Sequence, residues 1–228
     1  MAQFLQLAQR VRQETGTAGT GPTSVVSQSG QLAQLVTWTA QAYLDVCNKW
    51  DDYDFLWRES SVELELDVKD YVLANNLRAI NEDAFYVYGG SLPADGQKLD
   101  YIEYDNYRRS KTLDTGTGTP VCFTRLPSGE VRIIPTPDQS YTVEYEYWKE
   151  PTPLTTDTSV PEFSPIYDDC IIWRACWYWA SFNEAQAEMA AHDFNFNQAM
   201  QRLEARYLPA AERYHARSQG VDLVVRAE

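Results

Sequence analysis

The sequence predicts an α+β fold: a helical bundle formed by N- and C-terminal helices, with an antiparallel β region inserted between them. Apolar residues recur at helical spacing in residues 1–58, with a period of two in residues 59–150, and at helical spacing again in residues 166–217. A segment rich in proline and threonine, residues 151–165, precedes the last helices. Because the strands are grouped between two helical blocks, we expect the two blocks to pack together.

The composition limits the possible classes of function. The 228 residues include 33 acidic and 19 basic side chains, which give a net charge of −14. Such a charge argues against wrapping DNA or RNA and against docking on anionic lipid, since both need Lys and Arg. No apolar stretch is long enough for a membrane span, and the charged N-terminus predicts no signal peptide. The four cysteines form no CxxC pair, so we expect reduced, buried thiols in a protein that folds in a cytoplasm.

The N-terminal helices follow from apolar spacing. Phe4, Leu7, Ala8 and Val11 lie on one face of a helix predicted over residues 3–14. The next segment, residues 15–29, contains three glycines and a proline and is predicted to be a loop. A second helix is predicted over residues 30–50, and three aromatics alternate with carboxylates after it.

The β region is marked by alternation between Val62 and Val68, where apolar and acidic residues take turns. Further strands are predicted at residues 84–88, 99–104, 120–125, 130–135 and 141–149. Turn residues join the last three runs, so we expect these runs to form a meander. A short helix is predicted at residues 105–111, and residues 115–119 are expected to form a flexible tip.

The C-terminal part begins with a predicted helix at residues 166–182 that is apolar nearly all round and must therefore be buried in a core or between subunits. Asn183 marks a reversal, and a last helix is predicted over residues 184–207, with helical residues resuming to about Arg217. The tail, residues 218–228, has the composition of an extended strand.

A search for chemistry finds weak signals only. The glycines of residues 16–21 lack the spacing and the Lys of a phosphate-binding loop. The acidic residues Asp51, Asp52 and Asp54 could bind a divalent cation but lack the spacing of a calcium loop, so a solvated helix end is the favoured interpretation.

The remaining titratable groups also give no specific signal of a catalytic or metal site. Carboxylates that share strand faces could act on a glycoside but usually solvate a sheet; they are Glu63, Glu65, Asp67, Glu144 and Glu146. His192 and His215 have no partners at ligand spacing, and neither do the cysteines. We therefore expect no enzyme, no metal and no cofactor.

The content of aromatic residues is unusually high for a chain of this length. The 15 Tyr, 8 Phe and 7 Trp exceed what a core of this size commonly uses. Aromatic side chains are enriched at protein–protein interfaces, so we expect them to fill both the core and contacts with partners.

The arrangement of these segments resembles a known family. Residues 4–14 (FLQLAQRVRQE) run into a glycine-rich loop ending at Pro22, and a helix follows from residues 30–33 (GQLA) to Trp50. Residues 54–57 (DFLW) come next, and residues 165–173 (PIYDDCIIW) open a helical hairpin that closes on Tyr207. Over nearly its whole length the chain resembles the head-to-tail adaptor (connector, head-completion) proteins of tailed bacteriophages.

The resemblance implies a structural virion protein in the neck, between the capsid portal and the tail, that is made in the host bacterial cytoplasm. It implies a homo-oligomeric ring, usually of twelve copies, below the portal protein. Such a ring extends the DNA channel and is the attachment platform for tail or nozzle proteins and for tail fibres. Twelve copies at −14 each would carry −168, and a negative channel repels phosphate, so DNA passes without specific binding.

The resemblance also assigns expected contacts. The C-terminal segment of this family often reaches onto the portal, so the expected portal-docking residues are Val221, Leu223, Val224 and Val225. A ring needs a heterologous interface with two different faces on each subunit. The expected interface residues are Ile172, Trp173, Trp177, Trp179, Trp50 and Trp57.

Two other functions stay open at this point. Exposed Trp and Tyr stack on sugars, so a carbohydrate-binding module or surface lectin is the main alternative, and it predicts an all-β fold. A carboxylate-based hydrolase is the third hypothesis, and it needs two carboxyl groups in a cleft, one of them with a raised pKa.

Overall fold

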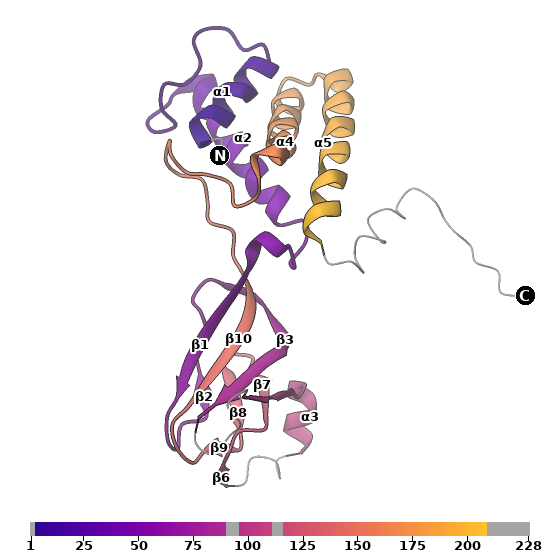
Figure 1. Cartoon of the computed structure of the whole chain (residues 1–228). Coiled ribbons are helices and arrows are strands. Elements are labelled where there is room, and N and C mark those ends of the chain that lie inside the picture. Colours follow the sequence, from indigo (N-terminus) through magenta and orange to yellow (C-terminus); the bar gives the residue numbers. More distant parts are fainter. Residues whose placement is uncertain (1–2, 90–95, 111–115, 209–228) are drawn as a thin grey trace, which may run out of the picture. The chain divides into compact units, whose positions relative to one another are not determined.

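The structure is a computed structural model that describes residues 3–89, 96–110 and 116–208. Two compact units make up the chain (Figure 1). The β unit is Trp57–Glu150, and the helical unit is formed by the described residues of Met1–Leu56 and Pro151–Glu228. The prediction of an α+β fold, with N- and C-terminal helices flanking a β region, is confirmed.

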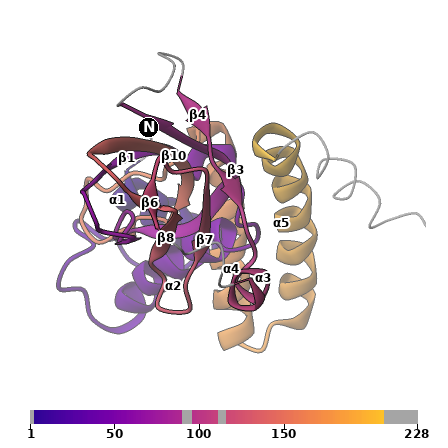
Figure 2. The same cartoon turned by 90° about the horizontal axis from the view of Figure 1, so that it is seen from below.

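The helical unit contains four helices. In both views α4 lies between α2 and α5 (Figures 1 and 2), and α1 packs against α2 and α4. The helices are α1 (Phe4–Glu14), α2 (Gly30–Cys47), α4 (Asp168–Phe182) and α5 (Gln186–Tyr207), with short 3-10 turns η1 (Asp54–Leu56) and η3 (Pro165–Tyr167).

Apolar spacing explains why these helices pack as they do. In α1 the buried side chains are the predicted stripe of Phe4, Leu7, Ala8 and Val11. The central helix α4 buries residues on several sides because it has neighbours on several sides. Each fully buried Leu, Ile or Phe side chain stabilises the fold by roughly 1.5–3 kcal/mol, so this packing holds the unit together.

In its described residues the β unit has two sheets of four strands and one short pair. Sheet A has the order β1-β10-β3-β4, with β1 (Trp57–Leu64), β10 (Tyr141–Lys149), β3 (Leu77–Tyr88) and β4 (Gln97–Lys98). Sheet B has the order β2-β8-β7-β5, with β2 (Asp70–Tyr71), β8 (Val131–Ile134), β7 (Cys122–Arg125) and β5 (Asp100–Tyr101). A short parallel pair joins β6 (Thr117–Gly118) to β9 (Thr136–Pro137).

The core of the β unit lies between sheets A and B. Along β10, residues from Tyr141 to Tyr147 are alternately buried and half-buried, and the buried ones meet Phe123, Val131 and Ile133 of sheet B. The other face of sheet B is covered by helix α3 (Tyr104–Arg109), whose Tyr107 packs with Cys122 and Ile134. The β unit therefore has three layers in the order sheet A, sheet B, α3.

The predicted meander is wrong for its third strand. β7 and β8 pair antiparallel as expected, but β10 leaves them and lies between β1 and β3 in sheet A. The physical reason is length. The nine residues of β10 find long partners in β1 and β3, of eight and twelve residues, whereas β8 offers four.

Two predicted elements have wrong ends, the strand predicted from alternation and the helix predicted from residue 166. The pattern from Val62 to Val68 continues past the end of β1 at Leu64, where Asp67 takes a positive φ and the chain turns; Leu66 and Val68 are consequently exposed. Ile166 is 80% exposed, because the α-helix begins at Asp168. The predicted helical residues between 209 and 217 lie outside the described residues.

Candidate functional site

Four of the expected interface residues lie on α4 and divide into two kinds. Ile172 is 0% exposed, so its side chain belongs to the core of the helical unit. Trp173, Trp177 and Trp179 are half-buried and keep part of their ring surface accessible. The predicted interface remains a prediction, and the tryptophans are the members of this group that could contact a partner.

Trp50 and Trp57 have different surroundings. The Trp50 Nε1–H donates to Oε1 of Glu204 at 3.0 Å, and Lys49 Nζ lies 2.7 Å from the same oxygen. Glu204 is only 3% exposed, so these donors compensate a buried carboxylate and connect the end of α2 to α5. Trp57 begins β1 in the β unit and is 46% exposed.

The expected portal-docking residues Val221, Leu223, Val224 and Val225 lie outside the described residues. Their role stays a prediction.

Arg174 organises a cluster that the sequence did not reveal. Its Nε donates to Oδ2 of Asp45 on α2 at 2.9 Å, and the Tyr178 hydroxyl donates to the same oxygen at 2.5 Å. The guanidinium carbon lies 4.8 Å from the ring centre of Trp177 and 5.5 Å from that of Phe196 on α5. Burial raises the pKa of Asp45, but the hydrogen bonds from Tyr178, Gln41 and Arg174 outweigh it and lower the pKa. The cluster therefore stays ionised at neutral pH and connects three helices.

A second aromatic contact lies beside it. The Trp173 ring stacks on the His192 imidazole of α5, with ring centroids 5.8 Å apart. Burial lowers the pKa of His192, so the imidazole is neutral at pH 7. This contact is a packing contact of the α4–α5 hairpin.

The outward surface of α2 and one exposed stripe of α5 lack charged side chains, although α5 exposes Glu188, Asp193, Arg202 and Arg206 elsewhere. Asp45 is the only charged residue of α2, whose exposed side chains include Gln31, Thr37 and Gln41. On α5, one exposed stripe at helical spacing consists of Ala187, Ala190, Ala191, Phe194, Gln198 and Gln201. Phe194 is 62% exposed and Phe182, at the end of α4, is 60% exposed. Interface cores are depleted of charge, so these two surfaces are candidates for contacts between proteins.

A small cleft adjoins the α2 surface. It is lined by Thr17, Gln31, Gln34, Leu35, Trp38, Trp179, Phe182 and Asn183. The Trp38 and Phe182 rings lie 5.5 Å apart, so the cleft presents aromatic walls with amides at its rim.

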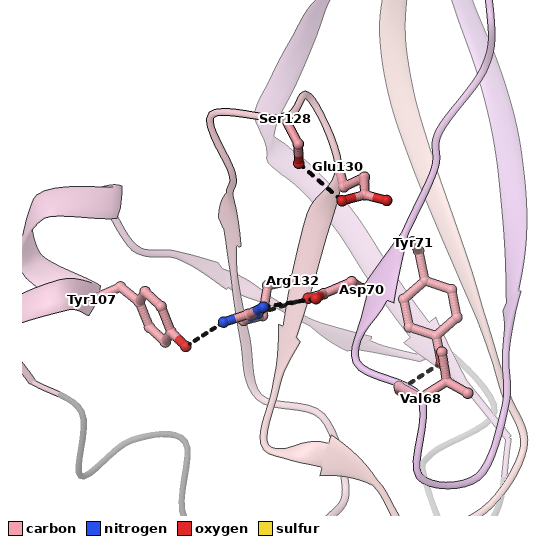
Figure 3. Close-up of polar contacts among 7 residues, drawn as sticks. All are labelled: Val68, Asp70, Tyr71, Tyr107, Ser128, Glu130 and Arg132. Atoms are coloured by element: carbon pink, nitrogen blue, oxygen red, sulfur yellow. Dashed lines mark hydrogen bonds and ion pairs between the residues drawn. The ribbon is translucent and has the colours of Figure 1, made fainter.

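The β unit contains a polar network that local sequence patterns do not mark. Arg132 of β8 binds both carboxylate oxygens of Asp70 on β2, and its Nη1 donates to the Tyr107 hydroxyl of α3 at 2.8 Å (Figure 3). The network fastens α3 to sheet B. Beside it Tyr71 donates to the Val68 carbonyl, and Ser128 donates to Glu130 in the β7–β8 turn (Figure 3).

The carboxylates considered for hydrolysis are separated by the end of β1. Glu63, Glu144 and Glu146 lie on strands of sheet A, whereas Glu65 and Asp67 follow the end of β1. Within residues 3–89, 96–110 and 116–208, no group of three or more His, Cys, Asp or Glu side chains could hold a metal ion. Among the helices in the described ranges, none has the length and apolar character to cross a membrane.

Comparison with known proteins identifies the family of the chain. The family described as SU10 adaptor protein matches residues 2–220. No individual curated protein matches significantly. Because the family match spans nearly the whole sequence, the chain belongs to the SU10 adaptor family of bacteriophage head-to-tail adaptor proteins.

Proposed function

We propose that this adaptor forms a ring of twelve copies, the number that the resemblance implies, below the portal protein at the virion neck. The ring extends the DNA channel and is the platform to which tail or nozzle proteins, and tail fibres, attach. The observation that carries the proposal is a pair of exposed surfaces without charged side chains, one on α2 and one stripe of α5. The two helices lie on either side of α4 (Figures 1 and 2).

The placement of these surfaces suits a ring. A closed ring with one kind of contact joins two different faces of each subunit, so each copy needs complementary faces on different sides. Phe194 on α5 is a protruding aromatic side chain, and the Trp38–Phe182 cleft beside α2 is an aromatic-lined recess. We propose that the α5 surface of one copy packs on the α2 surface of the next, with Trp177 and Trp179 at its margin.

Portal docking is assigned to the C-terminal segment. Val221, Leu223, Val224 and Val225 could add a strand to the portal or fill an apolar groove on it. The net charge of −14 suits a channel wall that repels phosphate, so the DNA slides through without specific binding.

The α+β fold weighs against the lectin alternative, which required an all-β chain.

Ring formation is tested with purified portal. The wild-type chain is mixed with portal, and particles are counted by electron microscopy and mass photometry. Phe194→Glu puts a charge in the proposed interface and should lower the yield of rings by about tenfold or more. Val72→Glu changes a similarly exposed apolar residue in the β unit and serves as the matched control. Equal ring yields for both variants, with unchanged circular dichroism, would contradict the α5 assignment.

Portal docking has a separate test. A chain that ends at Gln219 should keep its fold and fail to bind portal, whereas a chain that ends at Arg226 should bind. Virions that assemble normally with the shorter chain would rule out docking through the tail.

A further inference from the structure

The outer face of sheet A, the side turned away from sheet B, combines acidic and aromatic side chains. In the register of β1 and β10, Trp57 lies opposite Trp148 and Glu59 lies opposite Glu146. Glu144, opposite Ser61, and Glu63, opposite Thr142, complete the acidic set. Trp57 and Tyr86 are also exposed on strands of this sheet.

This face is poorly compensated within the chain. Glu146 Oε2 accepts bonds from Trp57 Nε1 at 3.2 Å and from Asn81 Nδ2 at 3.0 Å, and Glu63 accepts the Thr142 hydroxyl. These donors are neutral, and no Lys or Arg of the described residues forms an ion pair with any of the four glutamates.

Two features of this face destabilise the folded chain. Glu59 and Glu146 are directly opposite, which places their Cβ atoms about 5 Å apart, and like charges at that distance destabilise a sheet. The indole N–H of Trp148 is buried and has no hydrogen-bond partner in the described structure. The first destabilising effect would be offset by a partner that brings positive charge to this face.

The opposite side of the β unit presents the complementary chemistry. Arg108 and Arg109 are exposed on α3, which covers the far side of sheet B, and neither guanidinium has an ion-pair partner among the described residues. Tyr107 next to them is fixed by Arg132, which is itself held by Asp70 (Figure 3). The helix that bears the two arginines is therefore held in place on sheet B.

We infer that in the ring the α3 arginines of one copy dock on the outer face of sheet A of the next copy. The inference rests on the proposed ring and identifies a second contact between its subunits. Arginine suits this face because it pairs with carboxylates through two parallel hydrogen bonds and stacks on Trp and Tyr rings. A second copy is the favoured partner because the layer order sheet A, sheet B, α3 places the two complementary surfaces on opposite sides of each β unit, as a head-to-tail contact requires.

The experiment exchanges the charges. Rings are assembled on portal from the variants Glu59→Lys/Glu144→Lys, Arg108→Glu/Arg109→Glu, and all four changes together. Each double variant should lower ring yield at 0.15 M salt by about tenfold, and the combined variant should recover most of the loss. The control Glu82→Lys/Asp100→Lys changes the net charge of the chain as much as the first variant but at exposed positions away from this face, and it should assemble normally.

The outcomes separate this contact from the ring itself. Wild-type rings together with normal rings from both double variants would overturn the contact and leave the ring proposal intact. Variants that form rings but no longer recruit tail proteins would also overturn it, because the acidic face would then bind a tail component. Failure of the wild-type chain to form any ring would overturn both proposals.

Discussion

Arg132 binds Asp70 through two hydrogen bonds: its Nε and Nη2 donate to the two carboxylate oxygens at 2.6 and 2.7 Å. The pair joins β2 at the edge of sheet B to β8, and Nη1 of Arg132 donates to the Tyr107 hydroxyl of α3. Because Arg donates from a planar fork, no other side chain can make all three bonds at once.

Replacement of Arg132 by Lys should therefore destabilise the β unit although the charge is kept. We expect a loss of roughly 1–3 kcal/mol in the free energy of unfolding, since the pair is partly shielded from water and two bonds are lost. Urea unfolding followed by circular dichroism measures the loss. Arg125→Lys is the control, because Arg125 is exposed on neighbouring β7; equal stability of the two variants would show that the fork is dispensable.

The central helix offers a contrast between core and surface. Ile172→Ala should cost about 2–5 kcal/mol, because a fully buried side chain leaves a cavity in the helical unit. Trp177→Ala, five residues further along the same helix, removes a half-buried ring. It should lower the stability less than Ile172→Ala does and lower the yield of assembled rings more. Thermal unfolding and particle counts on portal separate the two effects; the reverse order of stabilities would contradict this reading of α4.

Local sequence patterns explain how much of this structure was predictable. Each element must bury particular side chains, and this requirement sets the helical spacing in α1 and α4 and the alternation along β10. These patterns can therefore be recognised from the sequence alone. Pairing is a different matter. Asp70 and Arg132 are 62 positions apart, and nothing in the residues around either one marks the other as its partner.

The candidate surfaces were only partly predictable for the same reason. The high content of aromatic residues indicated interfaces with other proteins. The sequence could not show that Ile172 is buried and Trp173 beside it half-buried, because α4 is apolar nearly all round. Glu144 and Glu146 share a strand face in the sequence, whereas their position opposite Ser61 and Glu59 depends on the register of β10 with β1. That register comes from long-range packing.

The four cysteines should be unreactive in the folded chain. All of them are buried, and burial raises the pKa of Cys170 and of Cys176 to about 12. Only the thiolate attacks a disulfide reagent, so at pH 8 the reaction should await opening of the structure. A colorimetric thiol assay should find slow reaction in buffer and four fast thiols in denaturant. Fast reaction of any cysteine in buffer would show that the described packing around it is too loose.

Asp168 should give the helical unit a stability that falls as pH rises. This carboxyl group lies at the start of α4, is nearly fully buried, and its Oδ1 has no hydrogen-bond partner in the described structure. Burial raises its pKa from 3.8 to about 6, against the smaller opposing effect of Arg10.

The folded chain therefore holds this proton more tightly than the unfolded chain does. Between about pH 4 and pH 6 the stability contributed by Asp168 declines, and above pH 6 a constant penalty of roughly 2–3 kcal/mol remains. Asp168→Asn keeps the shape and cannot ionise, so it should be more stable than wild type at pH 7.5 and similar to it near pH 4. Unfolding in urea across pH 4–8, with the exposed-site variant Asp193→Asn as control, measures the difference between the chains. A difference that does not grow from pH 4 to pH 6 would mean that Asp168 is solvated or paired in the folded protein.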